Sequence, residues 1–169
     1  VSDYYGFPLY NFDLTDIFDN FKDKFDGIAD ENFTINSDIN LKPRLRMATL
    51  YYLSALFTAK TGITYLVAGT GNKSEGYVGY FTKGGDSVHD IAPIADLTVE
   101  EVIQIGEYLS VPKEVLYKKP SDGLSEQTDE EKLGITYKDI ALFMEDESKV
   151  SKDVAAKIKT LHKNSLHKF

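Results

Sequence analysis

Hydrophobic residues near the start of the chain recur at the spacing of an α-helix. A short strand is predicted over Leu9–Phe12, and a helix is predicted over Asp13–Phe25 directly after it. The apolar positions of this helix lie three or four residues apart, which places them on one face; they are Leu14, Ile17, Phe18, Phe21 and Phe25. The next stretch, Asp26–Asn40, is polar and predicts a loop.

The most hydrophobic helix is predicted from Pro43 to Lys60. Proline is compatible with the first turn of a helix, and Gly62 supplies a stop signal. Apolar side chains occur on nearly every face of this segment, so the helix must be covered on all sides. We expect the cover to come from a sheet and another helix, or from a partner subunit.

A continuous apolar run, Ile63–Ala68, follows and has the length of a strand. Unbroken hydrophobicity is typical of a parallel strand that is covered on both faces. Further along, the capping box Thr98-Val99-Glu100-Glu101 predicts a helix that runs to about Leu109. A short helix is predicted over Pro112–Tyr117.

The last third of the chain predicts a long flexible loop and then two amphipathic helices. The polar run Lys118–Gly134 is the loop, and the helices are expected near Tyr137–Met144 and Ser151–His162. Because predicted strands alternate with predicted helices along the chain, the fold class is α/β.

Composition narrows the classes of partner. Acidic residues outnumber basic ones by 27 to 19, a formal charge of −8, whereas nucleic acids and anionic membranes select basic surfaces. We therefore expect neither as a partner. The chain has no cysteine and three scattered histidines, which excludes a thiolate nucleophile and a thiolate zinc site. No apolar run is long enough to span a membrane and no signal-peptide pattern opens the chain, so a cytoplasmic protein is expected.

Two glycine-containing loops carry the candidate chemistry. Ligands of open α/β sheets bind beyond the carboxyl ends of the strands, and the loop Gly69–Glu75 follows a predicted strand. Thr70 offers a hydroxyl there, and Glu75 offers the hard oxygen that Mg²⁺ prefers. The segment Tyr80–Asp86 adds Lys83 and Asp86 among glycines, with His89 and Asp90 after them, as in an anion site with a metal. The alternatives are a simple turn for the first loop and a solvated loop for the second.

Eight sequence blocks in one order carry a resemblance to a known family. Together they closely resemble the ammonia-dependent NAD synthetases, of the adenine-nucleotide α-hydrolase-like superfamily. The blocks run from Asn40 to the end of the chain; they are Asn40–Met47, Gly69–Glu75, Gly79–Lys83, Asp90–Ile94, Lys119–Ser121, Gln127–Glu130, Leu133–Tyr137 and His167-Lys168.

The resemblance implies a Rossmann-like parallel sheet flanked by helices and a two-step ligation. The nicotinate carboxylate of deamido-NAD attacks the α-phosphate of Mg·ATP, and ammonia then displaces AMP to form NAD. By similarity, Thr70 and Ser121 contact ATP and Glu75 binds Mg²⁺. The residues implied for deamido-NAD are Arg44, Lys83, Asp90, His167 and Lys168. A homodimer through the Pro43–Lys60 helix is implied as well; no residue is assigned a catalytic role.

Arg44 also has an argument of its own. A cation near a predicted helix start opposes the helix dipole, and this unfavourable placement favours a role in ligand binding.

The chain departs from the family pattern in ways that leave alternatives open. It lacks the Ser-Gly-Gly-x-Asp-Ser loop that cradles the triphosphate, and Val99 stands where the family commonly has a lysine that touches ATP. We expect a single synthetase domain that is truncated at its N-terminus, lacks the first strands of the sheet and is inactive alone. The alternatives are an inactive dinucleotide-binding or dimerisation module, and a related ATP pyrophosphatase that acts on another acid.

Overall fold

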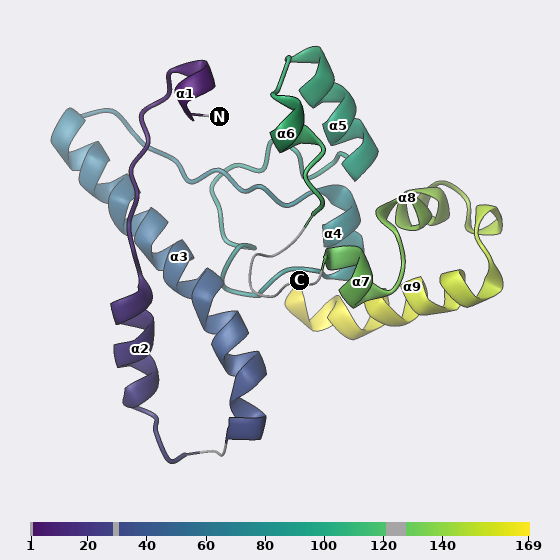
Figure 1. Ribbon diagram of the computed structural model, residues 1–169, viewed down its shortest axis with the longest axis horizontal. Helices are drawn as coiled ribbons and strands as arrows, with labels where there is room; N and C mark the ends of the chain where they lie inside the picture. The colour runs from purple at the N-terminus through teal and green to yellow at the C-terminus, as the bar shows by residue number, and fades with distance from the viewer. Residues whose placement is uncertain (1, 29–30, 121–127) are drawn as a thin grey trace. The chain divides into compact units, whose positions relative to one another are not determined.

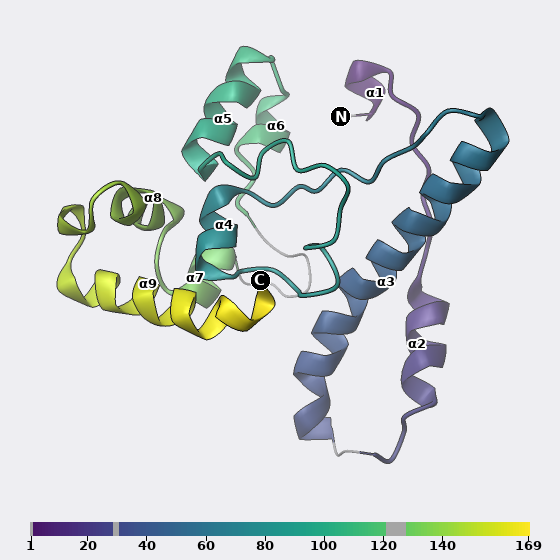
Figure 2. The same cartoon turned by 180° about the vertical axis from the view of Figure 1, so that it is seen from behind.

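The computed structural model describes residues 2–28, 31–120 and 128–169, and for residues 31–36 it describes the backbone alone. The chain divides into two compact units. Unit 1 contains the described residues of segments 1–9, 72–80 and 94–169, and unit 2 contains those of segments 10–71 and 81–93. Figures 1 and 2 show the elements from opposite sides.

Unit 2 is built on α2 (Thr15–Asp23) and the 31-residue helix α3 (Glu31–Thr61). The prediction of α2 is confirmed, but the loop predicted over Asp26–Asn40 is wrong for its second part, since α3 begins at Glu31. Its polar start gains contacts from α2: Lys22 forms a 2.6 Å ion pair with Asp38. These tertiary contacts stabilise a helix that the local sequence does not favour.

Three further predictions need correction. Pro43 lies inside α3 and not in its first turn, because the helix starts twelve residues earlier than the sequence pattern indicates. For the same reason Arg44 does not lie near a helix start, so the helix-dipole argument for its role in ligand binding does not hold. The strand predicted over Leu9–Phe12 is irregular backbone. The end of α3 is confirmed, because Gly62 takes the left-handed conformation with φ 72°, and its N–H donates to the Thr58 carbonyl.

The predicted strand Ile63–Ala68 pairs at a single point. Ala68 forms an isolated parallel bridge with Ile91, and within the described ranges no β-strand is present. The segment is not covered on both faces in unit 2, where Ile63 is 66% exposed and Leu66 is 56% exposed. Two side chains of α3 form hydrogen bonds with the backbone of Tyr65. The Tyr65 N–H donates to Thr58 Oγ1, and the Tyr65 carbonyl accepts from Ser54 Oγ. Those bonds occupy groups that a neighbouring strand would need.

Unit 1 is helical, and its core lies where α4 (Lys73–Val78), α8 (Tyr137–Glu145) and α9 (Lys152–Ser165) pack together (Figure 1). The buried hydrophobic residues of this core are Val78, Leu133, Ile135, Tyr137, Ile140, Phe143, Ala155 and Ile158. The 3₁₀ turn η1 (Glu147–Lys149) joins α8 to α9, and η2 (Leu166–Lys168) follows α9. Both predicted amphipathic helices are confirmed.

The described part of unit 1 contains further helices. They are α1 (Ser2–Tyr5), α5 (Val99–Tyr108), α6 (Lys113–Leu116) and α7 (Asp129–Leu133). The predictions of α5 and α6 are confirmed to within a residue or two. Helix α7 corrects the prediction of a loop over Lys118–Gly134, because Thr128 and Glu131 form a capping box that starts a helix there.

Candidate functional site

Glu75, the expected magnesium ligand, lies in the first turn of α4. It forms a capping box with Asn72: Glu75 Oε2 accepts from the Asn72 N–H at 2.9 Å, and Asn72 Oδ1 accepts from the Glu75 N–H at 3.0 Å. The sequence pattern predicts a loop here and misses the helix, although the box is visible in the sequence. One carboxylate oxygen of Glu75 therefore has a local structural role.

Thr70, the expected ATP contact, is exposed and lies two residues after the Ala68 bridge in unit 2. The backbone before it is held closely, since the Gly69 N–H donates to the Ile91 carbonyl at 2.7 Å. The His89 ring packs against Gly69 so tightly that a Cβ there would lie 2.6 Å from it. Glycine is thus required at position 69 by close approach.

Arg44 and Lys83 are 39 residues apart in sequence, and unit 2 brings them together. Arg44 Nε, on α3, donates to the carbonyl oxygen of Lys83 at 3.2 Å. Both side chains are exposed, and this bond uses the Nε donor of the guanidinium and not its two terminal amino groups. A guanidinium presents these donors in a fixed fork that matches phosphate or carboxylate oxygens.

Both carboxylate oxygens of Asp90 accept hydrogen bonds. Oδ2 accepts from the Val67 N–H at 2.7 Å, and Oδ1 accepts from the Tyr51 hydroxyl at 3.3 Å. The Asp90 N–H in turn donates to the Val67 carbonyl at 2.8 Å. Partial burial, together with the negative charge of Asp90, raises the pKa of Tyr51 above its usual value. Asp90 therefore ties the Ile63–Ala68 segment to α3.

His167 and Lys168, the C-terminal pair expected to bind the dinucleotide, lie in unit 1. Lys168 Nζ donates to the Gly79 carbonyl at 2.8 Å, and His167 Nδ1 lies 2.9 Å from the Asn164 carbonyl. Ser121, the second expected ATP contact, lies outside the described residues. The structure thus brings Arg44, Lys83 and Asp90 into unit 2, whereas Glu75 and the pair His167-Lys168 belong to unit 1.

A buried carboxylate in unit 1 carries no role in the sequence interpretation. Asp129 is only 5% exposed, and it accepts from the Tyr80 hydroxyl at 3.2 Å and from the Tyr137 hydroxyl at 3.3 Å. Burial raises the pKa of Tyr137 strongly, and the charges of Glu75 and Asp129 add to this. The family-like block Gln127–Glu130 is the signal that could have drawn attention to Asp129.

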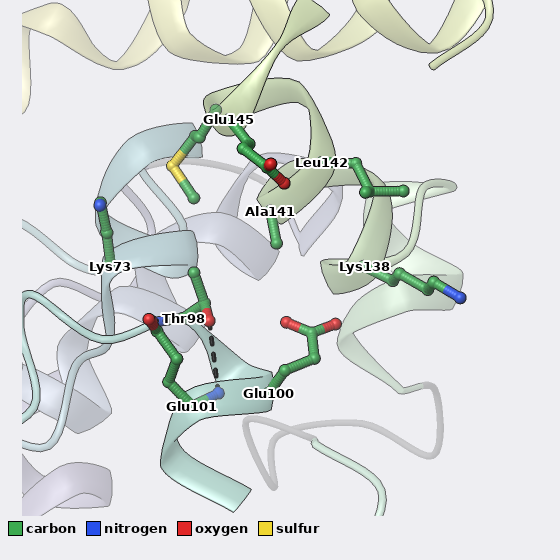
Figure 3. A pocket seen from close by; sticks show the side chains of 9 residues that line it. Lys73, Thr98, Glu100, Glu101, Lys138, Ala141, Leu142 and Glu145 are labelled. Carbon is green, nitrogen blue, oxygen red and sulfur yellow. Dashed lines mark hydrogen bonds between the residues drawn. The ribbon is translucent and has the colours of Figure 1, made fainter. Parts of the chain in front are cut away.

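A cavity of about 470 Å³ opens in unit 1 between the start of α5 and α8 (Figure 3). Its charged lining residues are Lys73, Glu100, Glu101, Lys138 and Glu145, and Leu142 and Met144 supply apolar surface. None of the expected site residues that the structure describes lines it. Glu101 already has hydrogen-bond partners there, because its carboxylate accepts from the Thr98 N–H and from the Thr98 hydroxyl.

Searches for two other kinds of site were negative in the part of the chain that the structure describes. No three residues among its histidines, aspartates and glutamates are grouped so that they could hold a metal ion. None of its helices combines the length and hydrophobicity needed to cross a bilayer.

Comparison with known proteins decides the family. The family model described as NAD synthase matches residues 1–169. The chain belongs to the NAD synthase family. The resemblance found in the eight sequence blocks is therefore confirmed.

Relatives of this NAD synthase chain carry a consistent name. The NH(3)-dependent NAD(+) synthetase of Alkaliphilus metalliredigens is 49% identical over 142 residues, which cover 83% of this chain and 55% of the relative. The chain spans about half the length of the curated relatives it matches.

Two solved structures place the NAD synthase chain among known folds. The NMN synthetase of Francisella tularensis is 33% identical with a TM-score of 0.87, and the match covers 99% of this chain and 66% of that one. The NH3-dependent NAD synthetase of Campylobacter jejuni, in complex with the nitrate ion, is 27% identical with a TM-score of 0.68; the match covers 92% and 60%. The neighbours are NAD and NMN synthetases, and the parallel sheet expected for this chain is represented by one bridge.

Proposed function

We propose that this chain is part of an ammonia-dependent ligase that converts deamido-NAD to NAD with ATP. The observation that carries the proposal is the match of the NAD synthase family to the whole chain, together with relatives named NH(3)-dependent NAD(+) synthetase. Because the chain spans half of these relatives, the activity belongs to the complete protein.

The proposed reaction has two balanced steps. The nicotinate carboxylate attacks the α-phosphorus of ATP, an oxygen–phosphorus bond forms, and pyrophosphate leaves. Ammonia then attacks the activated acyl carbon, AMP leaves, and a proton is lost as the amide forms. The first step brings anions together, so cationic side chains must offset their repulsion.

The contacts of unit 2 support the assignment of Arg44 and Lys83 to the dinucleotide. Arg44 is held by its Nε at the Lys83 carbonyl, and this tether reduces the side-chain entropy that binding must otherwise remove. We therefore assign the two cations to one phosphate group of the substrate. Asp90 adds order to unit 2 through its bonds to Val67 and Tyr51.

The described residues of this chain supply too few ligands for magnesium, so substrate oxygens must supply others. Glu75 contributes one carboxylate, which also caps α4, and Mg²⁺ in phosphate-transfer sites commonly has one or two carboxylates plus phosphate oxygens and waters. Magnesium would supply charge neutralisation of the triphosphate when bound. We assign Glu75 as its protein ligand, with Thr70 and Ser121 as ATP contacts. His167 and Lys168 are assigned to the dinucleotide.

Glu75→Gln tests the metal assignment sharply, because glutamine at this position can still complete a capping box. We expect the dependence of NAD formation on Mg²⁺ to weaken by about tenfold or more, the effect of losing one charged ligand. Asn72→Ala is the matched control, since it removes the cap and keeps the carboxylate. A magnesium titration that Glu75→Gln leaves unchanged would refute the assignment.

A second function has one specific observation in its favour. The fold match to the NMN synthetase is closer than the match to the Campylobacter NAD synthetase, with TM-scores of 0.87 and 0.68. The corresponding substrate is the nicotinate mononucleotide, which presents the same carboxylate without the adenylate half. The catalytic steps and the roles of Arg44 and Lys83 are unchanged in this alternative.

Product formation tests the proposal. The protein expressed from its full coding sequence is incubated with ATP, Mg²⁺ and ammonium, and with either deamido-NAD or the nicotinate mononucleotide. We expect NAD and AMP in equal amounts from the first substrate; preferential formation of NMN from the second would select the alternative. No amide from either would overturn the ligase function.

A binding experiment addresses the inactive-module alternative. The 169-residue chain and the full protein are titrated separately with deamido-NAD and with Mg·ATP in a calorimeter. A full protein that binds the dinucleotide and never ATP is a binding module and not a ligase.

A further inference from the structure

The turn that carries Lys83 is attached to α3 through a side-chain hydrogen bond. Thr82 Oγ1 donates to Asn40 Oδ1 at 3.0 Å across 42 residues of sequence, and the pair is partly buried. A second bond joins the same two segments, from Arg44 Nε to the Lys83 carbonyl. Asn40 and Arg44 lie four residues apart on α3, so they project from the same face of the helix.

The turn itself is ordered by bonds among its own residues. The Thr82 N–H donates to Asp86 Oδ1 at 2.9 Å, and the Gly84 N–H donates to Ser87 Oγ at 3.1 Å. Ser87 Oγ in turn donates to the Thr82 carbonyl at 3.2 Å. The turn therefore keeps its shape locally, and the bond from Thr82 to Asn40 sets where it sits on α3.

Backbone packing leaves little room for the turn to shift. Gly85 is buried against Pro43, and a Cβ on Gly85 would lie 3.0 Å from Pro43 Cβ and 3.1 Å from the Pro43 carbonyl carbon. Proline has no N–H, so this part of α3 offers the turn an apolar contact and no backbone donor. Orientation must come from the side chains on either side of the contact.

We propose that Asn40 and the Thr82 hydroxyl are positioning residues that hold the Lys83 turn on α3, so that Lys83 and Arg44 meet one substrate phosphate together. The inference rests on the proposed function, because it concerns the nucleotide that Arg44 and Lys83 bind. It adds two residues that act through Lys83 and do not themselves contact the nucleotide. Ligand affinity depends on such support, because a loose cation loses entropy when it binds.

Thr82→Val removes the hydroxyl at nearly constant volume, and Asn40→Ala removes the acceptor from a helical position that alanine favours. Deamido-NAD and the nicotinate mononucleotide are titrated by calorimetry into the full protein and its variants. We expect each variant to bind about tenfold more weakly, the size of one lost hydrogen bond. The double variant is expected to lose little more than either single variant, because both changes break the same bond.

Three comparisons separate positioning from a general structural role. Thr82→Ser keeps the hydroxyl and is expected to restore wild-type affinity. The loss caused by Lys83→Ala is expected to shrink in the Thr82→Val background, since Thr82 acts through Lys83. Thr49→Val removes a threonine hydroxyl on α3 that donates within the helix to the Leu45 carbonyl, and it is expected to leave affinity unchanged.

The outcomes are distinguishable. If the unmodified protein binds a nucleotide and Thr82→Val binds it equally well, or if Thr82→Ser binds as weakly as Thr82→Val, the positioning role is overturned and the proposed function stands. If Thr82 and Lys83 variants show additive losses, the hydroxyl does not act through Lys83, and the inference fails. If the unmodified protein binds neither nucleotide, the proposed function and this inference fall together.

Discussion

Asp129 shows how strongly one buried carboxylate depends on its neighbours. Burying a charged group is costly unless donors surround it, and two tyrosine hydroxyls donate to the two oxygens of Asp129. Each tyrosine belongs to a different segment of unit 1, Tyr80 after α4 and Tyr137 at the start of α8. The network therefore joins three segments of unit 1 around a single charge.

Tyr137→Phe tests this network through pH. The pKa of Tyr137 is raised in the folded protein, so unfolding releases its proton at alkaline pH, and stability is complete below the unfolded pKa of about 10 and falls as pH rises above it. We expect the variant to lose about 1–2 kcal/mol at neutral pH, because Asp129 loses a donor. We also expect a shallower loss of stability above about pH 10.

Urea unfolding at several pH values measures both effects of Tyr137→Phe. Tyr108→Phe is the control, since Tyr108 is 88% exposed, and it should match the wild type. An alkaline slope in Tyr137→Phe as steep as in the wild type would contradict the prediction.

Gly69 lies so close to the His89 ring that a larger residue would not fit. A Cβ at this position would lie 2.6 Å from the His89 ring, so Gly69→Ala is expected to destabilise the protein by about 1–3 kcal/mol through overpacking. His89→Ala removes the obstacle, and the double variant is expected to recover most of that loss in chemical denaturation. Equal losses in Gly69→Ala with and without His89 would show that the ring is not the cause.

At the scale of elements, local capping starts several helices, and glycine ends some of them. Four of the described helices, α4, α5, α7 and α8, begin with a capping box. The carboxylates of two such boxes, Glu101 and Glu131, have lowered pKa values because they accept hydrogen bonds from Thr98 and Thr128. These bonds span three residues, so neither packing nor a partner is needed to form them.

Two glycines that end helices provide a matched pair. Gly62 and Gly79 have φ values of 72° and 68°, so alanine at either position meets the strain of the left-handed region, roughly 1–2 kcal/mol. Nothing lies near a Cβ at Gly62, whereas a Cβ at Gly79 would clash with the Ser165 side chain. We expect Gly79→Ala to cost at least about 1 kcal/mol more than Gly62→Ala, because it overpacks the contact with the end of α9. Thermal unfolding of the two variants measures the difference, and equal losses would count against it.

At the scale of the whole molecule, α3 exposes large apolar side chains. Tyr52 is 68% exposed and Leu56 is 48% exposed, and their spacing of four residues places them on one face of the helix. Exposed apolar surface of this kind marks a site of association. We therefore propose that α3 forms a homodimer interface, as the sequence resemblance implies.

Tyr52→Glu with Leu56→Glu tests the interface. We expect the wild type to sediment as a dimer and the double variant as a monomer, since two charges per subunit would be buried without partners. Lys163→Glu, a charge change at an exposed position of α9, should leave the dimer intact. A monomeric wild type in analytical ultracentrifugation would rule the interface out.

The sequence by itself determined the helices whose signals are local. The periodic helices α2, α8 and α9 and the capped helix α5 follow from spacing and short-range bonds, and the eight blocks identified the family. The sequence also named the candidate residues. It could not predict the contact between Arg44 and Lys83, because these positions are 39 residues apart.

Tertiary structure decided the rest, for a common physical reason. The polar start of α3 is helical where it packs beside α2, with Lys22 paired to Asp38 and Lys42 over the Phe18 ring. The apolar run Ile63–Ala68 extends no ladder because Ser54 and Thr58 of α3 bond the backbone of Tyr65. In each case, side chains on another element bond to the segment. These tertiary bonds, and not the local preference of the sequence for helix or strand, decide the structure of the segment.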